Sequence, residues 1–312
     1  MARQESIDGS DNDALFRIVK YAHGVAASFI DMEHQMKATR KTLLGAGLAL
    51  ALLGGAGNAM ADSVWSSAIT KWDGDCSGGQ RDWWDDMCMA WRHEMADRGF
   101  VPVWENFHLV KVGKYADPSI TNWAYDNSRM DAHDAGLICT HGSIDGPGWV
   151  GTMHTREGGE CGLNVNQMKL GKASGGRMRF FHMSSCQSMQ WDNRLAWFGA
   201  AKGGVHVIAG FHGLMYIGSQ YVDEYEELAA DGTVSKGVGK AWVDNMHHVD
   251  HWYNSYKTIC PVAMGFGNTA ARSADVLNER YASKWSDTAA NWATTRYISG
   301  CDPSTGGGAL PN

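Results

Sequence analysis

Two stretches of the chain decide the fold: GLICTHGS at residues 136–143 and MRFFHMSSCQS at residues 178–188. Each begins with a short apolar run of the length of a buried strand and ends in small or reactive side chains. Two further apolar runs of this kind occupy residues 107–112 and 205–209. All four are bounded by glycine or polar residues, so we expect four buried strands at residues 107–112, 136–139, 178–183 and 205–209.

Helical patterns alternate with these strands. Within residues 81–98, apolar side chains recur at helical spacing, namely Trp84, Cys88, Trp91 and Met95, and Gly99 follows as a stop signal. We also expect helices at residues 191–201 and 234–256, whereas no apolar run predicts a strand between residues 62 and 81. Strands that alternate with helices predict an α/β fold, a three-layer αβα sandwich with a mostly parallel sheet.

The composition is that of an ordinary globular chain. Of 312 residues, 44% are hydrophobic and 20% are charged, which predicts a packed core and excludes disorder or coiled coil as the main architecture. The net charge of −7 is spread along the chain, and no basic run occurs beyond residue 41, so we expect no nucleic-acid partner. We expect one domain at residues 62–302 and a flexible, glycine-rich tail at residues 303–312.

Residues 36–61 have the pattern of a secretory signal peptide. A basic start precedes an apolar run that is too short to span a bilayer, and Ala59-Met60-Ala61 is a site that signal peptidase accepts. We expect cleavage before Asp62 and a secreted or periplasmic protein that leaves the membrane after cleavage. Residues 1–35 are then an extension of the gene model. If translation instead starts at Met1, an uncleaved anchor is the alternative.

The cysteine count bears on the chemistry. Seven cysteines follow residue 61, at positions 76, 88, 139, 161, 186, 260 and 301, and an oxidising compartment permits disulfide bonds. Because seven is odd, at least one thiol has no partner within the chain. Cys186 is the candidate for a free, reactive thiol. Cys139 lies inside an apolar run and would suit the alternative, a buried inert thiol.

The two deciding stretches place a thiol and an imidazole at strand ends. If these strands are adjacent and parallel, His141 and Cys186 leave the sheet at the same edge, about 5 Å apart in the direction across the strands. An imidazole there can activate the thiol as a base or hold it as a thiolate. Gly142 permits close backbone approach, so its N–H and that of Cys186 can face a developing oxyanion. The positive end of the helix at residues 191–201 would further lower the thiol pKa.

This arrangement resembles the caspase, legumain and gingipain superfamily of cysteine peptidases, of which the chain would be a divergent branch. An apolar strand ending in His-Gly is followed, 45 residues later, by an apolar strand ending in Ser-Cys-Gln-Ser, close to the roughly 50 residues of caspases. The resemblance implies a caspase-like αβα fold and a secreted peptidase that hydrolyses peptide bonds of peptides or proteins. It implies His141 as general base and acid, Cys186 as nucleophile, and neither cofactor nor metal.

The resemblance also implies residues that hold the substrate. The amides of Gly142 and Cys186 would form the oxyanion hole, and Ser185 and Gln187 flank the nucleophile. The strand at residues 205–209 runs into Phe211 and His212, where the following loop shapes the substrate pocket in relatives.

A function of a different class remains open: a secreted, non-catalytic binding domain on the same fold, stapled by disulfides. In that case Cys186 should be paired. A papain-like order, with the base after the nucleophile, would use His212 or His247 instead. His182 and His206 lie within or beside strands, and we interpret them as core residues.

Three other polar groups have both a functional and a structural interpretation. His247 and His251 stand four residues apart on a predicted helix and could bind a metal together with Asp244, although a solvated helix face is the commoner outcome. The acidic runs at residues 157–160 and 221–227 are expected to be loops. They could bind Ca²⁺, but most runs of this kind are only solvated.

Overall fold

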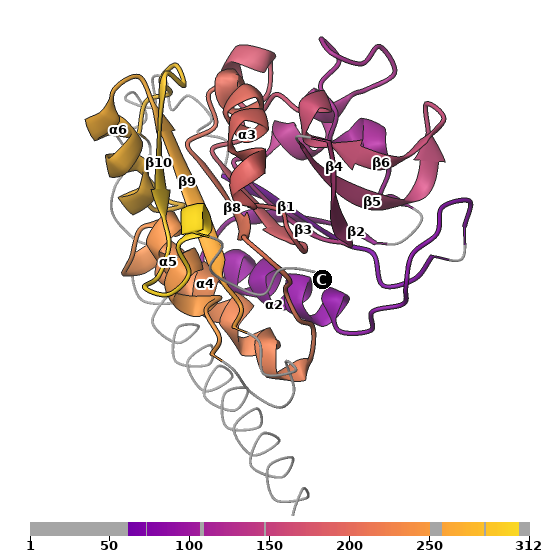
Figure 1. Ribbon diagram of the computed structural model, residues 1–312, viewed down its shortest axis with the longest axis horizontal. Helices are drawn as coiled ribbons and strands as arrows, with labels where there is room; N and C mark the ends of the chain where they lie inside the picture. Colours follow the sequence, from indigo (N-terminus) through magenta and orange to yellow (C-terminus); the bar gives the residue numbers. More distant parts are fainter. Residues whose placement is uncertain are drawn as a thin grey trace, which may run out of the picture. The chain divides into compact units, whose positions relative to one another are not determined.

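The computed structural model describes residues 62–305, apart from residues 73, 107–108, 147, 250–257 and 284. The predicted signal peptide, the extension before it, His251 and the last seven residues of the tail lie outside these residues. The described chain has an α/β fold (Figure 1). No helix in this part of the chain combines the length and the apolar character that a membrane crossing requires.

A seven-stranded mixed sheet forms the centre of the fold, in the order β10-β9-β8-β7-β3-β1-β2. Five neighbouring strands are parallel, namely β8 (Val207–Phe211), β7 (Phe180–Ser184), β3 (Ala135–Cys139), β1 (Ser63–Ala68) and β2 (Val101–Asn106). Strands β9 (Pro261–Gly267) and β10 (Trp292–Arg296) add two antiparallel pairings at one edge. The prediction of an α/β fold with a mostly parallel sheet is confirmed.

Helices and a smaller sheet cover this central sheet. Helices α2 (Trp84–Asp97), α4 (Val222–Val234) and α5 (Val238–Asn245) gather on one side, and α3 (Arg194–Ala200) lies on the other (Figure 1). An antiparallel sheet of β4 (Gly142–Asp145), β5 (Gly148–Glu157) and β6 (Glu160–Asn164) follows β3, and α6 (Ala270–Asp275) follows β9. This arrangement is compatible with a three-layer sandwich.

The alternation of side chains along each strand builds two apolar cores. Leu137 and Phe180 belong to the core that contains the buried face of α2, whereas Ile138 and Phe181 belong to the core that contains Trp197 of α3. Successive strand residues point to opposite faces of a sheet, so both faces must be apolar when both are covered. This explains why β3 and β8 are apolar throughout and why β7 departs from that pattern only at His182 and Ser184.

Two of the strand predictions are wrong. The expected strand at residues 107–112 is displaced, because β2 ends at Asn106 and Val112–Lys114 forms a 3-10 turn. A strand was not expected between residues 62 and 81, yet β1 lies there, between β3 and β2. Its sequence SVWSSA hides it, because Ser66 and Ser67 are fully buried polar residues. Ser67 is satisfied by a hydrogen bond with the hydroxyl of Tyr115.

The helix predictions are correct in part. Helix α2 is confirmed, and Gly99 follows it with a φ of +90°, the left-handed conformation that ends a helix. The helix expected at residues 191–201 forms as a 3-10 turn followed by α3. The single helix expected at residues 234–256 is wrong, because α5 ends at Asn245. The acidic run at residues 221–227 is not a loop but the start of α4, where carboxylates face the positive end of the helix.

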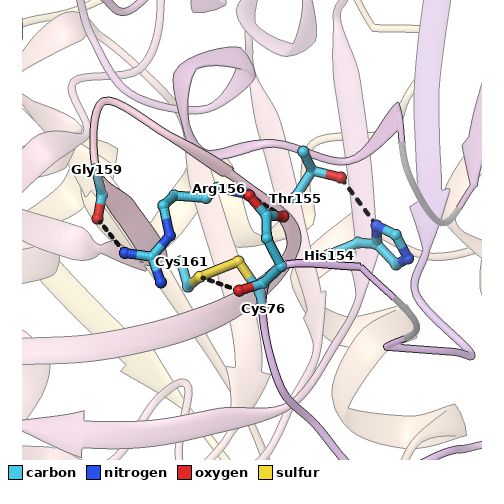
Figure 2. The surroundings of a disulfide bond; sticks show 7 residues. Cys76, His154, Thr155, Arg156, Gly159 and Cys161 are labelled. Atoms are coloured by element: carbon cyan, nitrogen blue, oxygen red, sulfur yellow. Dashed lines mark hydrogen bonds between the residues drawn. A yellow bond between two sulfur atoms is a disulfide. The ribbon is translucent and has the colours of Figure 1, made fainter.

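Three disulfide bonds staple the fold, in agreement with the prediction of disulfides. Cys88–Cys139 joins α2 to the end of β3, Cys260–Cys301 joins β9 to the C-terminal segment, and Cys76–Cys161 joins the segment after β1 to β6. Cys139 is therefore not an inert thiol. Figure 2 shows the third bond beside Arg156, whose guanidinium donates to the carbonyl oxygen of Gly159 at 2.9 Å. These bonds are compatible with an oxidising compartment.

Candidate active site

The pairing of β3 with β7 aligns His141 with Cys186. The two strands are adjacent and parallel, and their register pairs Ala135 with Phe180 and Cys139 with Ser184. This offset of 45 residues is the same as the separation of His141 from Cys186. The alignment continues past the strands, since Thr140 N–H donates to the carbonyl oxygen of Ser184 at 3.2 Å. The two residues therefore leave the carboxyl edge of the sheet at the same level.

His141 is held by aromatic rings and by one hydrogen bond. Its ring lies 4.7 Å from that of Trp72 and 4.9 Å from that of Trp84, measured between centroids. Its Nε2 lies 2.6 Å from the carbonyl oxygen of Gly79. Because a carbonyl only accepts, Nε2 must carry the proton and Nδ1 keeps the lone pair of the neutral ring. Burial lowers the pKa of His141; the hydrogen bond to Gly79 opposes this in part and the nearby charge of Arg81 adds to it, so the neutral base is favoured.

Cys186 is the free cysteine among the described residues, and it is partly buried. Its Sγ lies 3.6 Å from the carbonyl oxygen of Met215 and accepts from the N–H of that residue at 3.5 Å. Burial raises the pKa of Cys186, and the Met215 contact and the charge of Arg81 oppose this only in part. The net shift of the Cys186 pKa is therefore upward, opposite to the lowering expected from the following helix. The neutral form is thus favoured for both the Cys186 thiol and the His141 imidazole.

Gly142, the first residue of β4, lies against the turn that carries Ser185 and Cys186. A Cβ at this position would be 2.2 Å from Ser185 Oγ and 2.3 Å from the carbonyl oxygen of Cys186, so only glycine fits. Gly142 also faces Gly151 in the β4–β5 ladder as a non-hydrogen-bonded pair, because Thr152 N–H donates to the carbonyl oxygen of His141 at 2.9 Å. The Gly142 N–H thus stays outside the ladder and is available to an oxyanion.

Ser185 and Gln187 shape the turn that carries the thiol. Ser185 is fully buried, and its Oγ accepts from Trp149 Nε1 at 3.2 Å, so it supports the turn from below. Gln187 has a φ of +56°, and no other non-glycine residue in the described part of the chain has a positive φ. Its N–H donates to the carbonyl oxygen of Gly213 at 2.7 Å. A left-handed glutamine beside a free thiol is a strained position of the kind found at functional sites.

Phe211 and His212 take different positions. Phe211 is buried against Trp242 and lines a small apolar cavity, as does Met215, which contacts the thiol. His212 is also buried, but it does not line that cavity. Burial lowers the pKa of its imidazole, an effect opposed by Asp192 and Asp302.

This apolar cavity reaches Met215, the residue that contacts the Cys186 thiol, and has room for about one water molecule. No carboxylate, guanidinium or ammonium group lines it. Its lining residues are Met87, Phe211, Met215, Tyr216, Tyr221, Tyr225, Met246, His248 and Ile259. A larger cavity, lined by Asp134, Arg177 and Arg179, lies at the opposite edge of the sheet, where β3 and β7 begin. Ligands of open α/β sheets bind at the carboxyl edge, which favours the Cys186 side.

The other candidate histidines have structural partners. His182 stacks on Trp242, with ring centroids 5.3 Å apart, and its Nε2 lies 2.7 Å from the hydroxyl of Tyr281. His206 Nδ1 is hydrogen-bonded to the buried carboxylate of Glu279 at 2.6 Å. His247 Nδ1 is 3.1 Å from the carbonyl oxygen of Ile259. Within the residues that the structure describes, no group of three or more His, Cys, Asp or Glu side chains is arranged to hold a metal ion.

Sequence reasoning missed the supporting residues of the site. Trp72, Gly79 and Arg81 come from the segment after β1, and Met215 comes from the loop after β8. None belongs to a motif. The strand β1 would have indicated a loop at the same edge, but its polar sequence concealed it.

Comparison with known proteins identifies no family. The sequence matches no protein-family model, and it shows no significant similarity to a curated protein.

Proposed function

We propose that this protein is a cysteine peptidase with a His141–Cys186 dyad, a divergent relative of the caspase, legumain and gingipain superfamily. One observation carries the proposal. The register of β3 and β7 places the free thiol of Cys186 and the neutral imidazole of His141 at the same level of two adjacent strands, and Nε2 of His141 is hydrogen-bonded to the carbonyl oxygen of Gly79. A third group that fixes the tautomer and orientation of the base is characteristic of nucleophilic dyads and triads.

The proposed reaction begins from the neutral pair. Nδ1 of His141 takes the proton of Cys186 as Sγ attacks the carbonyl carbon of the scissile peptide bond. The negative charge moves to the carbonyl oxygen, and the N–H groups of Gly142 and Cys186 stabilise it. His141 then gives its proton to the leaving amine, and the C–N bond breaks to leave a thioester. Water, deprotonated by His141, hydrolyses the thioester, and the proton returns to Cys186.

The small apolar cavity lined by Met215, the residue that contacts the thiol, supports a substrate class. Because no carboxylate, guanidinium or ammonium group lines it, an aspartate, glutamate, lysine or arginine side chain there would lose much of its hydration without a strong ion-pair partner. The space suits a methyl group. We therefore propose cleavage after a small apolar residue such as alanine.

Export is part of the proposal. The signal-like segment at residues 36–61 and the three disulfide bonds support a secreted or periplasmic enzyme. The rival function, a disulfide-stapled binding domain, needs no unpaired cysteine at the carboxyl edge of the sheet. An unpaired Cys186 therefore favours the enzyme.

Thiol labelling tests the dyad before any substrate is known. Purified protein is treated with iodoacetamide at pH 7, and the adduct at Cys186 is followed by mass spectrometry. His141→Ala is compared with His93→Ala, a matched control on the exposed face of α2. If labelling slows at least about tenfold in His141→Ala but not in His93→Ala, the result supports the dyad. Equal rates in all three proteins would return the protein to the binding-domain hypothesis.

A peptide library completes the test. Wild-type protein should cleave some members, Cys186→Ala should cleave none, and His141→Ala should lose a similar factor because members of a catalytic pair fail together.

A further inference from the structure

The loop between β2 and β3 buries carboxylate oxygens that have no partner. Asp126 and Asp117 are both fully buried. In the described ranges of the chain, no hydrogen bond of good geometry reaches either carboxylate oxygen of Asp126, Oδ2 of Asp117 or the buried amide oxygen of Asn127. Buried polar atoms in folded proteins are nearly always paired, and burying an ionised carboxylate without a partner is strongly unfavourable. Four orphaned oxygens in one loop therefore require an explanation.

These residues are neighbours in space as well as in sequence. Asp126 N–H points to the carbonyl oxygen of Ala116, the residue before Asp117, at 3.4 Å. Asp117 and Asp131 both act on Asp126 electrostatically: burial raises the pKa of Asp126 first, and these two carboxylates raise it further. Among the described residues, no lysine, arginine or histidine forms an ion pair with Asp117 or Asp126. The described part of the protein thus supplies no ion-pair partner for the carboxylates of Asp117 and Asp126.

Asp131 differs from its neighbours because its carboxylate is already satisfied. It accepts from the N–H groups of Gly171 and Met178, at 3.0 Å each, and from the hydroxyl of Ser174 at 3.1 Å. Ser174 in turn accepts, through its carbonyl oxygen, from the amide of Asn127 at 2.9 Å. This network fixes one wall of the loop and aligns Asn127, whose amide nitrogen is used while its oxygen is not.

We propose that this loop binds a calcium ion through the carboxylates of Asp117 and Asp126 and the amide oxygen of Asn127. All the orphaned atoms are hard oxygen donors, the ligand type that Ca²⁺ takes, whereas zinc and copper prefer nitrogen and sulfur ligands. Ca²⁺ takes six to eight oxygens in flexible geometry and commonly completes its shell with backbone carbonyls and water. Two carboxylates would balance the charge of the ion, and the ion would remove the cost of burying these carboxylates without a partner.

The site would act on stability and lies outside the proposed dyad. The loop leads directly into β3, whose far end carries His141, so a bound ion would hold the chain that enters the central sheet. The inference does not depend on peptidase activity, and the two can fail separately.

The test uses the purified chain, freed of metal with EDTA and titrated with CaCl₂. Isothermal titration calorimetry should show one Ca²⁺ per chain, and the midpoint of thermal unfolding should rise by several degrees. Asp126→Asn keeps the shape of the side chain and removes its charge, so it should abolish both responses. Asp145→Asn removes an exposed carboxylate at the end of β4 and should leave both intact.

Two results would overturn the proposal. The first is an absence of Ca²⁺ binding and of any thermal shift in the wild-type protein, which requires no variant and would leave Asp126 as a buried, protonated acid. The second is Ca²⁺ binding that persists in Asp126→Asn and in Asp117→Asn, because the ion would then lie elsewhere. If Asp126→Asn does not fold, Asp117→Asn and the wild-type titration still decide.

Discussion

The contact at Gly142 predicts a large functional effect from one methyl group. In Gly142→Ala, the new Cβ would lie 2.3 Å from the carbonyl oxygen of Cys186 and 2.2 Å from Ser185 Oγ. Real Cβ atoms keep at least 3.0 Å, so the two loops must separate by about 0.7 Å at the backbone of the nucleophile. A rotation of Ser185 cannot relieve this, since one of the two contacts is to backbone.

The size of the effect follows from that displacement. A shift approaching 1 Å at a reacting group costs on the order of 100-fold in rate, so we expect kcat/KM to fall between about 10-fold and 100-fold, or about 1.4–2.7 kcal/mol. Overpacking should also lower the free energy of unfolding by about 1–3 kcal/mol. Fluorogenic peptide hydrolysis, iodoacetamide labelling of Cys186 and urea unfolding measure the three effects on the same protein.

Gly199→Ala is the matched control, because a Cβ there meets nothing within 4 Å and the residue lies within α3. Alanine in a helix is favoured over glycine, so this variant should be fully active and slightly more stable. If Gly142→Ala keeps the labelling rate and kcat/KM of Gly199→Ala within about twofold, the loops are not in functional contact, and the oxyanion role of Gly142 is refuted.

Three further predictions concern pH, disulfides and substrate. Because burial lowers the pKa of His141 from its usual value of 6.5, the base stays neutral at pH 6.5, so kcat/KM should hold at that pH and fall only at lower pH. A pH profile whose acid limb has its midpoint at or above pH 6.5 would contradict the neutral dyad. The Cys88–Cys139 bond spans 51 residues, so replacing both with alanine should lower the free energy of unfolding by about 4 kcal/mol, measured by urea titration; a loss below about 1 kcal/mol would show that α2 docks without the bond. Peptides with alanine before the scissile bond should exceed those with aspartate or arginine by at least about tenfold in kcat/KM, and a preference for either charged residue would exclude the apolar cavity as the subsite.

The sequence alone determined the central strands and the first helix of the fold. Strands β3, β7 and β8 are buried on both faces, so their residues must be largely apolar and form a run that the sequence shows directly. The apolar stripe of α2 is equally local, since one face of a helix repeats every three to four residues. The separation of His141 from Cys186 also matched the register of β3 against β7, because the chain between them returns to the same edge of the sheet.

Elements with buried polar or outwardly charged residues stayed hidden. Strand β1 buries Ser66 and Ser67, and only the hydroxyl of Ser67 is hydrogen-bonded, to Tyr115, 48 residues away. The start of α4 looked like an acidic loop, yet Tyr225 and Leu228 form its buried face against the core. In both cases a local pattern was outweighed by tertiary contacts that no window of sequence contains.

For the site, the sequence supplied the reactive groups and the tertiary structure supplied their environment. An odd number of cysteines requires a leftover thiol, but only the distances between folded segments decide that Cys186 is the one left over. Likewise, the residue type of His141 permits either charge state and either tautomer. The carbonyl oxygen of Gly79, 62 residues away, selects the tautomer, and burial selects the neutral charge state, because solvent exclusion and hydrogen-bond direction exist only once the chain has folded.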